Sequence, residues 1–309
     1  MIEIFFLGVG ATYPIKEDGM PCIAIRRSGR IFLFDCGENC QVEYFKSKLG
    51  VNKPLIIFIT HMHGDHFLGI APLLQTFSLQ RRKRELIIYG PLGIRQHLWN
   101  TINVNALGFP VKINEILHEG MLIEEKEYYI EAINAIHNIE AYSFIFTERD
   151  KLGKFNVEKA KKLGIPEGPL RKRLKEGKSI IINNKIIYPE DVLGPPIKGI
   201  KISYSGDTKI NEKFANKAYE SDILIHEATF SEKDQEEARL TGHSTSRDAA
   251  ITALEASAKL LFIVHISARY KEKNILLMEA KNIFRRTYLA YKNMKLTIYK
   301  NRFLGVIID

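Results

Sequence analysis

The sequence predicts an α/β fold in which two β-sheets are covered by helices. Short apolar runs rich in β-branched and aromatic residues recur along the chain, and several segments between them have apolar residues at helical spacing. We find no internal repeat and no low-complexity tail, and this mixture of strands and helices over 309 residues is typical of stacked sheets flanked by helices. The expected strands are 4–7, 31–35, 55–60, 86–89, 128–136, 142–147, 200–204, 223–225, 261–264, 296–299 and 303–308.

Four segments have the periodicity of amphipathic helices. The third of them has the clearest start, because the hydroxyl side chains of Ser244, Thr245 and Ser246 are suited to the N-cap position. The expected helices are 67–79, 93–100, 246–257 and 273–291.

Composition and charge limit the class of protein. Apolar residues make up 45% and charged residues 26%, which allows a sizeable core and argues against global disorder. The net charge of +9 and the pI of ≈ 9.2 indicate an anionic partner, with nucleic acid as the first candidate. The apolar start of the chain is short and lacks a basic leader, and no apolar stretch reaches the roughly 20 residues of a membrane span. We therefore expect a soluble, cytoplasmic protein with no membrane partner.

The chain has three cysteines, Cys22, Cys36 and Cys40. An odd and small number argues against a disulfide framework and fits a reducing compartment. Because Cys36 and Cys40 have no second cysteine pair to complete a zinc knuckle, we expect small buried thiols.

One stretch of the chain is unusually basic. Residues 151–178 contain ten Lys or Arg against three Glu, so this surplus of seven is most of the surplus of nine in the whole chain. The stretch also holds the rigid turn signal GIPEGP at 164–169. We expect residues 151–198 to form an inserted arm with little core of its own. A charge run is most often a solvated surface or lid, and this alternative stays open beside nucleic-acid binding.

The strongest chemical signal is a string of potential metal ligands, His61, His63, Asp65 and His66, directly after an apolar strand. Four such side chains within six residues can converge only if the chain turns tightly, which Gly64 permits. Imidazole suits Zn²⁺, and a carboxylate among the histidines lets a second cation bind nearby. Two cations about 3.5–4 Å apart can activate a water and stabilise the leaving oxygen of a phosphodiester.

Three further side chains occur in a matching position. His137, Asp207 and His265 each follow an apolar strand directly. A lone Asp after a strand is more often a turn or cap residue, but the repetition of this pattern favours ligands gathered from several strand ends.

The ligand string resembles the signature of the metallo-β-lactamase superfamily, and six further segments are similar to the ribonuclease Z family of tRNA 3′-processing endoribonucleases. The resemblance runs from residue 2 to about residue 270 in the expected order. The six segments are 6–14 (FLGVGATYP), 33–38 (LFDCGE), 205–208 (SGDT), 226–230 (HEATF), 242–245 (GHST) and 265–270 (HISARY).

The resemblance implies a four-layer αββα sandwich formed by one domain over residues 1–309, with residues 151–198 as a flexible exosite that grips precursor tRNA. It implies two Zn²⁺ per subunit. The ligands would be His61, His63 and His137 for one zinc, Asp65, His66 and His265 for the other, and Asp207 as the bridge. A homodimer is also implied.

The implied activity is removal of the 3′ trailer from precursor tRNA, leaving a 3′-hydroxyl on the tRNA. Asp65 would also orient or deprotonate the attacking water. Glu227 would hold the imidazole of His243, and His243 would contact the phosphate or protonate the leaving oxygen. A carboxylate beside a histidine raises its pKa and keeps it a hydrogen-bond donor. His243 could also cap the following helix, and the two roles are compatible.

The sequence departs from the family pattern in three places, none of which removes a ligand. Pro14 is not followed by the family's Arg-Asn pair, Asn39-Cys40 replaces a Gly-Thr pair, and Ser143-Phe144 replaces a Gly-Tyr pair. The first departure affects how the tRNA end, with or without CCA, is read. Arg269 either faces a substrate phosphate or braces the site. We expect His97, His118 and His226 to be structural or surface residues.

Two other functions remain open. The first is a hydrolase of the same superfamily that acts on a small phosphodiester, thioester or sulfate ester, against which the basic arm and the 242–245 motif argue. The second is a metal-bearing RNA-binding module without catalysis, against which the intact ligand set argues.

Overall fold

The computed structural model describes residues 1–299 and 302–308. The chain divides into two compact units, each described by itself below. Unit 1 comprises Met1–Glu124, Tyr129–Phe146 and Lys201–Asp309, and unit 2 comprises Glu125–Tyr128 and Thr147–Ile200.

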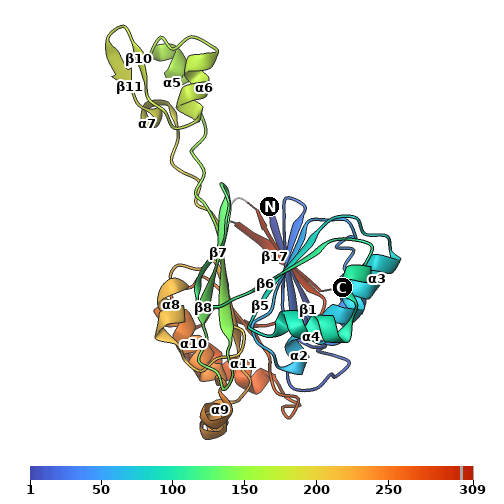
Figure 1. Cartoon of the computed structure of the whole chain (residues 1–309). Helices are drawn as coiled ribbons and strands as arrows, with labels where there is room; N and C mark the ends of the chain where they lie inside the picture. The colour runs from blue at the N-terminus through green and yellow to red at the C-terminus, as the bar shows by residue number, and fades with distance from the viewer. Residues whose placement is uncertain (300–301, 309) are drawn as a thin grey trace. The chain divides into compact units, whose positions relative to one another are not determined.

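Unit 1 contains two large sheets, which Figure 1 shows face to face. In the first sheet, β3 to β6 run parallel and the remaining neighbours pair antiparallel. Among the described residues its order is β17 (Arg302–Ile308), β16 (Met294–Tyr299), β1 (Ile2–Gly8), β2 (Cys22–Arg27), β3 (Arg30–Phe34), β4 (Leu55–Phe58), β5 (Leu86–Gly90) and β6 (Val111–Glu115).

The second sheet is parallel from β12 to β15, whereas β7 and β8 pair antiparallel. Its order, again for the described part of the chain, is β15 (Thr287–Leu289), β14 (Leu261–Val264), β13 (Ile223–Glu227), β12 (Lys201–Tyr204), β9 (Tyr142–Glu148), β8 (Tyr128–Asn134) and β7 (Gly120–Glu124).

Aromatic side chains fill the space between the two sheets. Phe144 of β9 packs on Phe34 and Phe58 of the first sheet at ring-centroid distances of 5.9 and 5.4 Å, and Phe6 packs on Phe262 at 5.7 Å. Strands that are buried on both faces need apolar side chains at nearly every position, which accounts for the continuous apolar runs in the sequence.

Helices cover the outer face of each sheet (Figure 1). One apolar cluster joins the first sheet to α1 and α3, and another joins the second sheet to α8, α10 and α11. The layers are therefore helix, sheet, sheet and helix, which confirms the predicted fold class. The helical elements of unit 1 are α1 (Cys40–Lys46), α2 (Gly64–Phe67), α3 (Ile70–Leu79), α4 (Ile94–Thr101), η1 (Val104–Ala106), α8 (Glu212–Lys217), η2 (Glu232–Asp234), α9 (Gln235–Thr241), α10 (Ser246–Glu255) and α11 (Asn274–Ile283).

The predicted helix at 246–257 is confirmed, and its start shows why. The Thr245 hydroxyl accepts the backbone N–H of Asp248, and the Asp248 carboxylate accepts the N–H of Thr245, which is a capping box. The predicted helix at 273–291 is too long, because the chain becomes extended at Phe284 and then adds β15 to the sheet. The predicted helix at 67–79 starts too early, because α2 ends at Phe67 and α3 runs from Ile70 to Leu79.

Unit 2 has a small apolar core of six buried side chains, which were not identified from the sequence. Its buried side chains are widely spaced among lysines, so the composition of the segment does not reveal them. The elements are α5 (Val157–Lys162), α6 (Pro169–Lys175), β10 (Ile180–Ile182), β11 (Lys185–Ile187) and α7 (Pro189–Val192), and the core consists of Ala160, Ile165, Leu174, Ile180, Ile187 and Val192.

Backbone pairing closes unit 2 at its base. The amide N–H of Lys151 donates to the carbonyl of Ile197 at 2.9 Å, and the N–H of Ile197 donates back at 2.8 Å. The two chain segments that flank residues 152–196 are therefore held together before α5 begins.

The three cysteines are buried free thiols, as expected from the sequence. In the described residues we find no helix with both the length and the apolar character that a membrane crossing requires.

Two glycines let separate loops touch beneath the ligand string. A Cβ at Gly37 would lie 2.0 Å from the carbonyl oxygen of Asp65, and a Cβ at Gly69 would lie 1.9 Å from the carbonyl oxygen of Gly37. The contact is fastened by hydrogen bonds from Cys36 N–H to the His66 carbonyl (2.7 Å) and from Gly69 N–H to the Cys36 carbonyl (2.9 Å). No side chain fits between these backbones.

We predict that Gly37→Ala destabilises the protein by about 1–3 kcal/mol, because the new methyl group must displace backbone rather than a flexible side chain. Thermal unfolding measures the effect. Gly108→Ala is the matched control, since the nearest atom to its Cβ is the Ser78 hydroxyl at 4.0 Å. Equal melting temperatures for both variants would contradict the prediction.

Candidate metal centre

The predicted ligands emerge where strands of both sheets end. His61 follows β4 of the first sheet, whereas Asp207 and His265 follow β12 and β14 of the second. His137 follows β8, which continues from unit 2 into unit 1. Because α2 begins at Gly64, the chain turns at once after His63 and places Asp65 and His66 in the first helical turn.

Four of the predicted ligands form a first group, in which the candidate ligand atoms lie within 4.8 Å of one another. The Nδ1 atom of His63 lies 2.9 Å from His61 Nε2 and 3.2 Å from His137 Nε2. An Asp207 carboxylate oxygen, Oδ2, lies 3.6 Å from His61 Nε2 and completes the group.

The remaining predicted ligands form a second group of Asp65, His66 and His265. The Nε2 atoms of the two histidines are 3.2 Å apart, and Asp65 Oδ2 lies 3.7 and 3.5 Å from them. Asp207 Oδ2 lies 3.3 Å from His66 Nε2 and 3.4 Å from His265 Nε2. The same oxygen of Asp207 thus touches both groups.

The geometry of both groups fits metal ions. In the first group, ring nitrogens of His61, His63 and His137 face one another. A single proton shared among them cannot form a hydrogen bond with all three nitrogens. Ligands about 2.0–2.1 Å from a tetrahedral ion are separated by about 3.3 Å, close to the 2.9–3.2 Å between these nitrogens. In addition, the second oxygen of Asp207, Oδ1, is buried and lacks a hydrogen-bond partner among the described residues. A cation would satisfy these atoms.

The protonation states of the candidate ligands are those that metal binding requires. Burial, reinforced by the neighbouring His66, holds the pKa of His61 well below its ordinary value, so the ring is neutral and offers a lone pair. Burial acts to raise the pKa of Asp207, but His265 and His66 outweigh it and hold the pKa well below the usual range. Asp207 is therefore an ionised carboxylate between the histidines.

Asp35 supports the centre and was not identified as a site residue from the sequence. Its buried carboxylate accepts the backbone N–H of Thr60 (2.8 Å), the Thr60 hydroxyl (2.9 Å), the Tyr204 hydroxyl (2.7 Å) and Nδ1–H of His66 (2.8 Å). This arrangement fixes the tautomer of His66 and aims Nε2 at the ligand group. A usable signal was present, because Asp35 ends an apolar strand just as Asp207 does.

Other ligands are oriented in the same way by their second ring nitrogen. Nδ1 of His137 donates to the carbonyl of Gly242 at 2.7 Å, and Nδ1 of His265 lies 2.8 Å from the Thr229 hydroxyl. Gly242 ends α9 with a φ of 82°, and a Cβ there would lie 2.9 Å from Nδ1 of His137. Glycine is therefore required at this position for two reasons.

Three non-glycine residues around the centre have left-handed backbone angles. They are Thr12, Asp35 and His265, with φ values of 68°, 58° and 55°. Such conformations cost of order 1–3 kcal/mol each and persist where the surrounding structure enforces them. Of the three, His265 is a candidate ligand, Asp35 accepts a hydrogen bond from His66, and Thr12 donates its backbone N–H to Asp65.

His243 and Glu227 form the expected pair. Nδ1 of His243 lies 3.0 Å from Oε1 of Glu227, whose carboxylate also accepts the backbone N–H groups of Thr208 and Thr229. Burial alone would lower the pKa of His243, but the Glu227 carboxylate raises it to about 9. His243 therefore carries a proton at neutral pH and offers a donor from its other nitrogen.

A cavity of ≈ 400 Å³ opens over the metal centre. It exposes Asp65, Asp207, His243 and His265, so the candidate ligands and the protonated imidazole face the same space. Thr12 also lines it and donates its backbone N–H to Asp65 Oδ2 at 3.1 Å.

The structure also places the residues with open roles. Arg269 forms a bidentate ion pair with Glu237, with both distances 2.6 Å, and lies over the Phe230 ring, which favours the bracing alternative. His226 is buried and donates to the Glu227 backbone carbonyl, and His97 packs on Phe67. Both contacts fit the structural role expected for these two histidines.

Comparison with known proteins gives the family. The chain is 44% identical to Ribonuclease Z of Nitrosopumilus maritimus (strain SCM1) over 284 residues, covering 91% of this chain and 95% of that protein. It is 38% identical to Ribonuclease Z of Archaeoglobus fulgidus, with coverage of 96% and 98%. The chain belongs to the ribonuclease Z family. A family model described as "Anti-Pycsar protein Apyc1" matches residues 2–245, so the chain also falls within the sequence group which that model describes.

Solved structures agree with this membership. The short form of human tRNase Z matches with a TM-score of 0.69 at 26% identity, covering 96% of this ribonuclease Z family chain and 99% of the human chain. A metallo-β-lactamase fold protein from Bacillus subtilis has the same TM-score at 17% identity, with coverage of 96% and 99%, and supports the fold alone. The resemblance stated from the sequence is confirmed.

We predict that Asp35→Ala weakens metal binding about 10–100-fold, because the ring of His66 loses the carboxylate that orients it. Titration of the metal-free protein with Zn²⁺, followed by calorimetry, measures the change. Tyr204→Phe removes only one of the hydrogen bonds to Asp35 and should have a smaller effect. Unchanged affinity in Asp35→Ala would show that Asp35 does not support the centre.

Proposed function

We propose that this ribonuclease Z family member is a zinc-dependent endoribonuclease that removes the 3′ trailer from precursor tRNA and leaves a 3′-hydroxyl on the tRNA. One observation carries the proposal. A chain 44% identical to a protein named Ribonuclease Z brings seven metal-type side chains from both sheets together, and four of them, His63, Asp65, Asp207 and His265, line one cavity.

For the metals we propose two Zn²⁺ per subunit. His61, His63 and His137 would hold one ion, Asp65, His66 and His265 the other, and Asp207 would bridge them. The position of Asp207 Oδ2 within 3.3–3.6 Å of His61, His66 and His265 supports the bridging role. Bound Zn²⁺ lowers the pKa of water toward 7 and so supplies a nucleophile at neutral pH.

Side chains of the protein would then accept and donate the protons of the reaction. Asp65 is ionised, held in place by the Thr12 N–H, and faces the cavity, where it can orient the attacking water and accept its proton. His243 is protonated at neutral pH and can contact the phosphate or donate a proton to the leaving oxygen. Glu227 is a positioning residue that keeps the imidazole of His243 charged and correctly turned.

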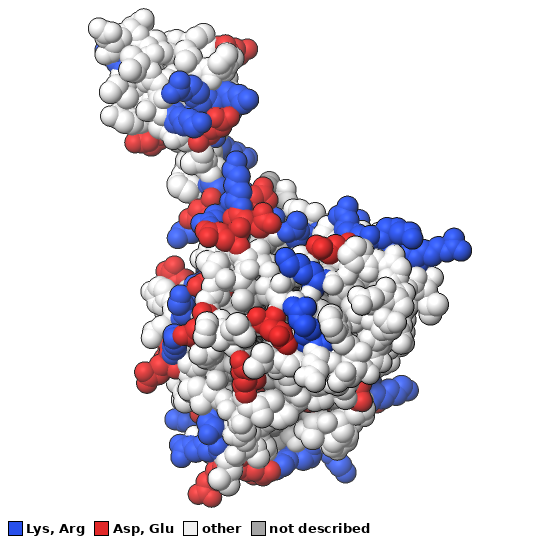
Figure 2. Space-filling model, in the orientation of Figure 1, with Lys and Arg blue, Asp and Glu red and all other residues white. Residues whose placement is uncertain are grey.

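Unit 2 would grip the body of the RNA. Its helices α5 and α6 carry exposed lysines and arginines, and Figure 2 shows Lys and Arg side chains gathered on the visible face of this unit. Such groups position RNA through its phosphates without reading its sequence. We further propose a homodimer, on the family resemblance, and a cytoplasmic location, which fits three free thiols.

We predict that His63→Ala and His243→Ala fail in different ways. His63→Ala should lose stoichiometric metal and all cleavage, because a ligand is gone. His243→Ala should keep its metal and its cleavage position but lower kcat by about 10²–10⁴, the usual contribution of one general acid. The measurements are metal content by atomic emission and mapping of the cleavage site on a precursor tRNA.

These two variants also separate the open functions. Cleavage at full rate by His63→Ala would exclude the metal mechanism. Wild-type protein that binds metal and RNA but hydrolyses no phosphodiester would establish the binding module instead.

We predict that replacing residues 152–196 with a short Gly-Ser linker abolishes precursor tRNA cleavage but spares hydrolysis of bis-p-nitrophenyl phosphate. The cut lies just inside the Lys151–Ile197 pairing, so the two segments that flank the deletion remain held together. A shorter deletion of 155–175 would leave half of the apolar core of unit 2 exposed. Full-rate tRNA cleavage by the deletion variant would refute the exosite role, and activity of the intact protein on small esters alone would favour the small-ester hydrolase.

A further inference from the structure

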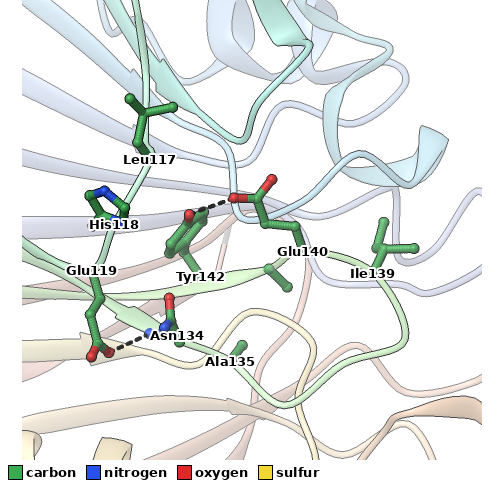
Figure 3. A pocket seen from close by; sticks show the side chains of 9 residues that line it. Leu117, His118, Glu119, Asn134, Ala135, Ile139, Glu140 and Tyr142 are labelled. Carbon is green, nitrogen blue, oxygen red and sulfur yellow. Dashed lines mark hydrogen bonds between the residues drawn. The ribbon is translucent and has the colours of Figure 1, made fainter.

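A second cavity, of ≈ 540 Å³, lies in unit 1 beside the loop that carries His137 (Figure 3). Figure 3 shows Leu117 and His118 on one side of it and Ile139 and Glu140, from that loop, on the other. None of these four side chains takes part in the metal centre described above. The cavity is therefore a separate feature of this unit.

Backbone pairing joins this cavity to the metal centre. Ala141 in its wall forms a β-bridge with His61, and the N–H of Tyr142 donates to the Thr60 carbonyl at 2.9 Å. Glu140 follows the candidate ligand His137 by three residues. The wall of the cavity and the candidate ligand His61 are therefore direct neighbours in the backbone.

One carboxylate of the cavity is fully occupied and the other is not. Glu119 accepts the backbone N–H of Asn134 at 3.1 Å with one oxygen and pairs with Lys213 through the other. Glu140 accepts the Tyr142 hydroxyl at 2.7 Å through Oε1. Its second oxygen makes no hydrogen bond with the described part of the chain and remains a free acceptor, anchored in place by Tyr142.

The other free groups are suited to a flat heterocycle. The Asn134 side chain offers amide donors and an acceptor, and His118 offers an exposed ring for stacking. Leu117 and Ile139 are 63% and 38% exposed and give the cavity apolar edges. An acidic wall repels phosphate, so a nucleotide would enter base first.

We propose that this cavity is a subsite for the nucleobase of an unpaired nucleotide beside the cleaved phosphodiester, with a preference for bases that carry an exocyclic amino group. The inference rests on the proposed function. The amino group donates to Glu140, whereas uracil has no amino group to offer at this position. A divalent cation is a poorer occupant, because among the described residues the cavity wall contributes no group of three converging ligand atoms.

The test uses two sets of four precursor tRNAs: one set varies only the nucleotide on the 5′ side of the cleaved bond, the other only the nucleotide on its 3′ side, with each of the four bases in turn. We expect wild-type protein to discriminate against uracil in kcat/KM at one of these positions. Glu140→Gln, which keeps the shape but adds a donor, should reduce that discrimination about tenfold. His118→Ala should raise KM for all four bases at that position, since stacking is insensitive to base identity.

The control is Glu255→Gln, which removes the same charge at the exposed end of α10 and should behave as wild type. Melting temperature and metal content check that each variant is intact. Wild-type cleavage with a base preference unchanged in Glu140→Gln would overturn the subsite and leave the proposed function standing. Intact protein that cuts none of the precursors would overturn both.

Discussion

The metal centre depends on one buried carboxylate. Asp35 follows β3, and its oxygens hold Thr60 at the end of β4, His66 in α2 and Tyr204 of β12 in the opposite sheet. A buried carboxylate without hydrogen-bond partners would be very costly, so its hydrogen bonds fix the relative position of strand ends from both layers. The hydrogen bonds of Asp35 hold the ends of strands from both sheets in place beneath the ligand string, so that its side chains can converge.

The sequence predicted the layers and the ligand groups well because both follow from local signals. Strands buried on both faces appear as continuous apolar runs, and a dense string of histidines directly after a strand is typical of a metal site. The C-terminal part was harder, since whether 284–291 extends a helix or adds β15 depends on a neighbouring strand edge that no local pattern reveals. Asp35 had a local signal, since it ends an apolar strand, but its hydrogen bond with Tyr204, 169 residues away, does not follow from any local pattern. The core of unit 2 was missed because its six members are scattered among lysines.

Charged side chains of different sign are concentrated in different parts of the molecule. Basic side chains gather on unit 2, acidic groups line the cavity beside His137, and the metal centre places histidines around ionised aspartates. In the function proposed above, phosphates of the RNA would bind at the first of these places, a base edge at the second, and the reacting phosphodiester at the third. A net charge of +9 therefore describes the protein poorly, since its local surfaces differ in sign.

Gly242 contacts both the candidate metal ligand His137 and the segment that leads to His243. Its carbonyl aims His137, and its left-handed turn ends α9 just before His243. If His137 binds a metal ion and His243 supplies a proton, as proposed above, a change of backbone at Gly242 would alter both properties together. A substitution at this position is therefore expected to change metal affinity and cleavage rate at the same time.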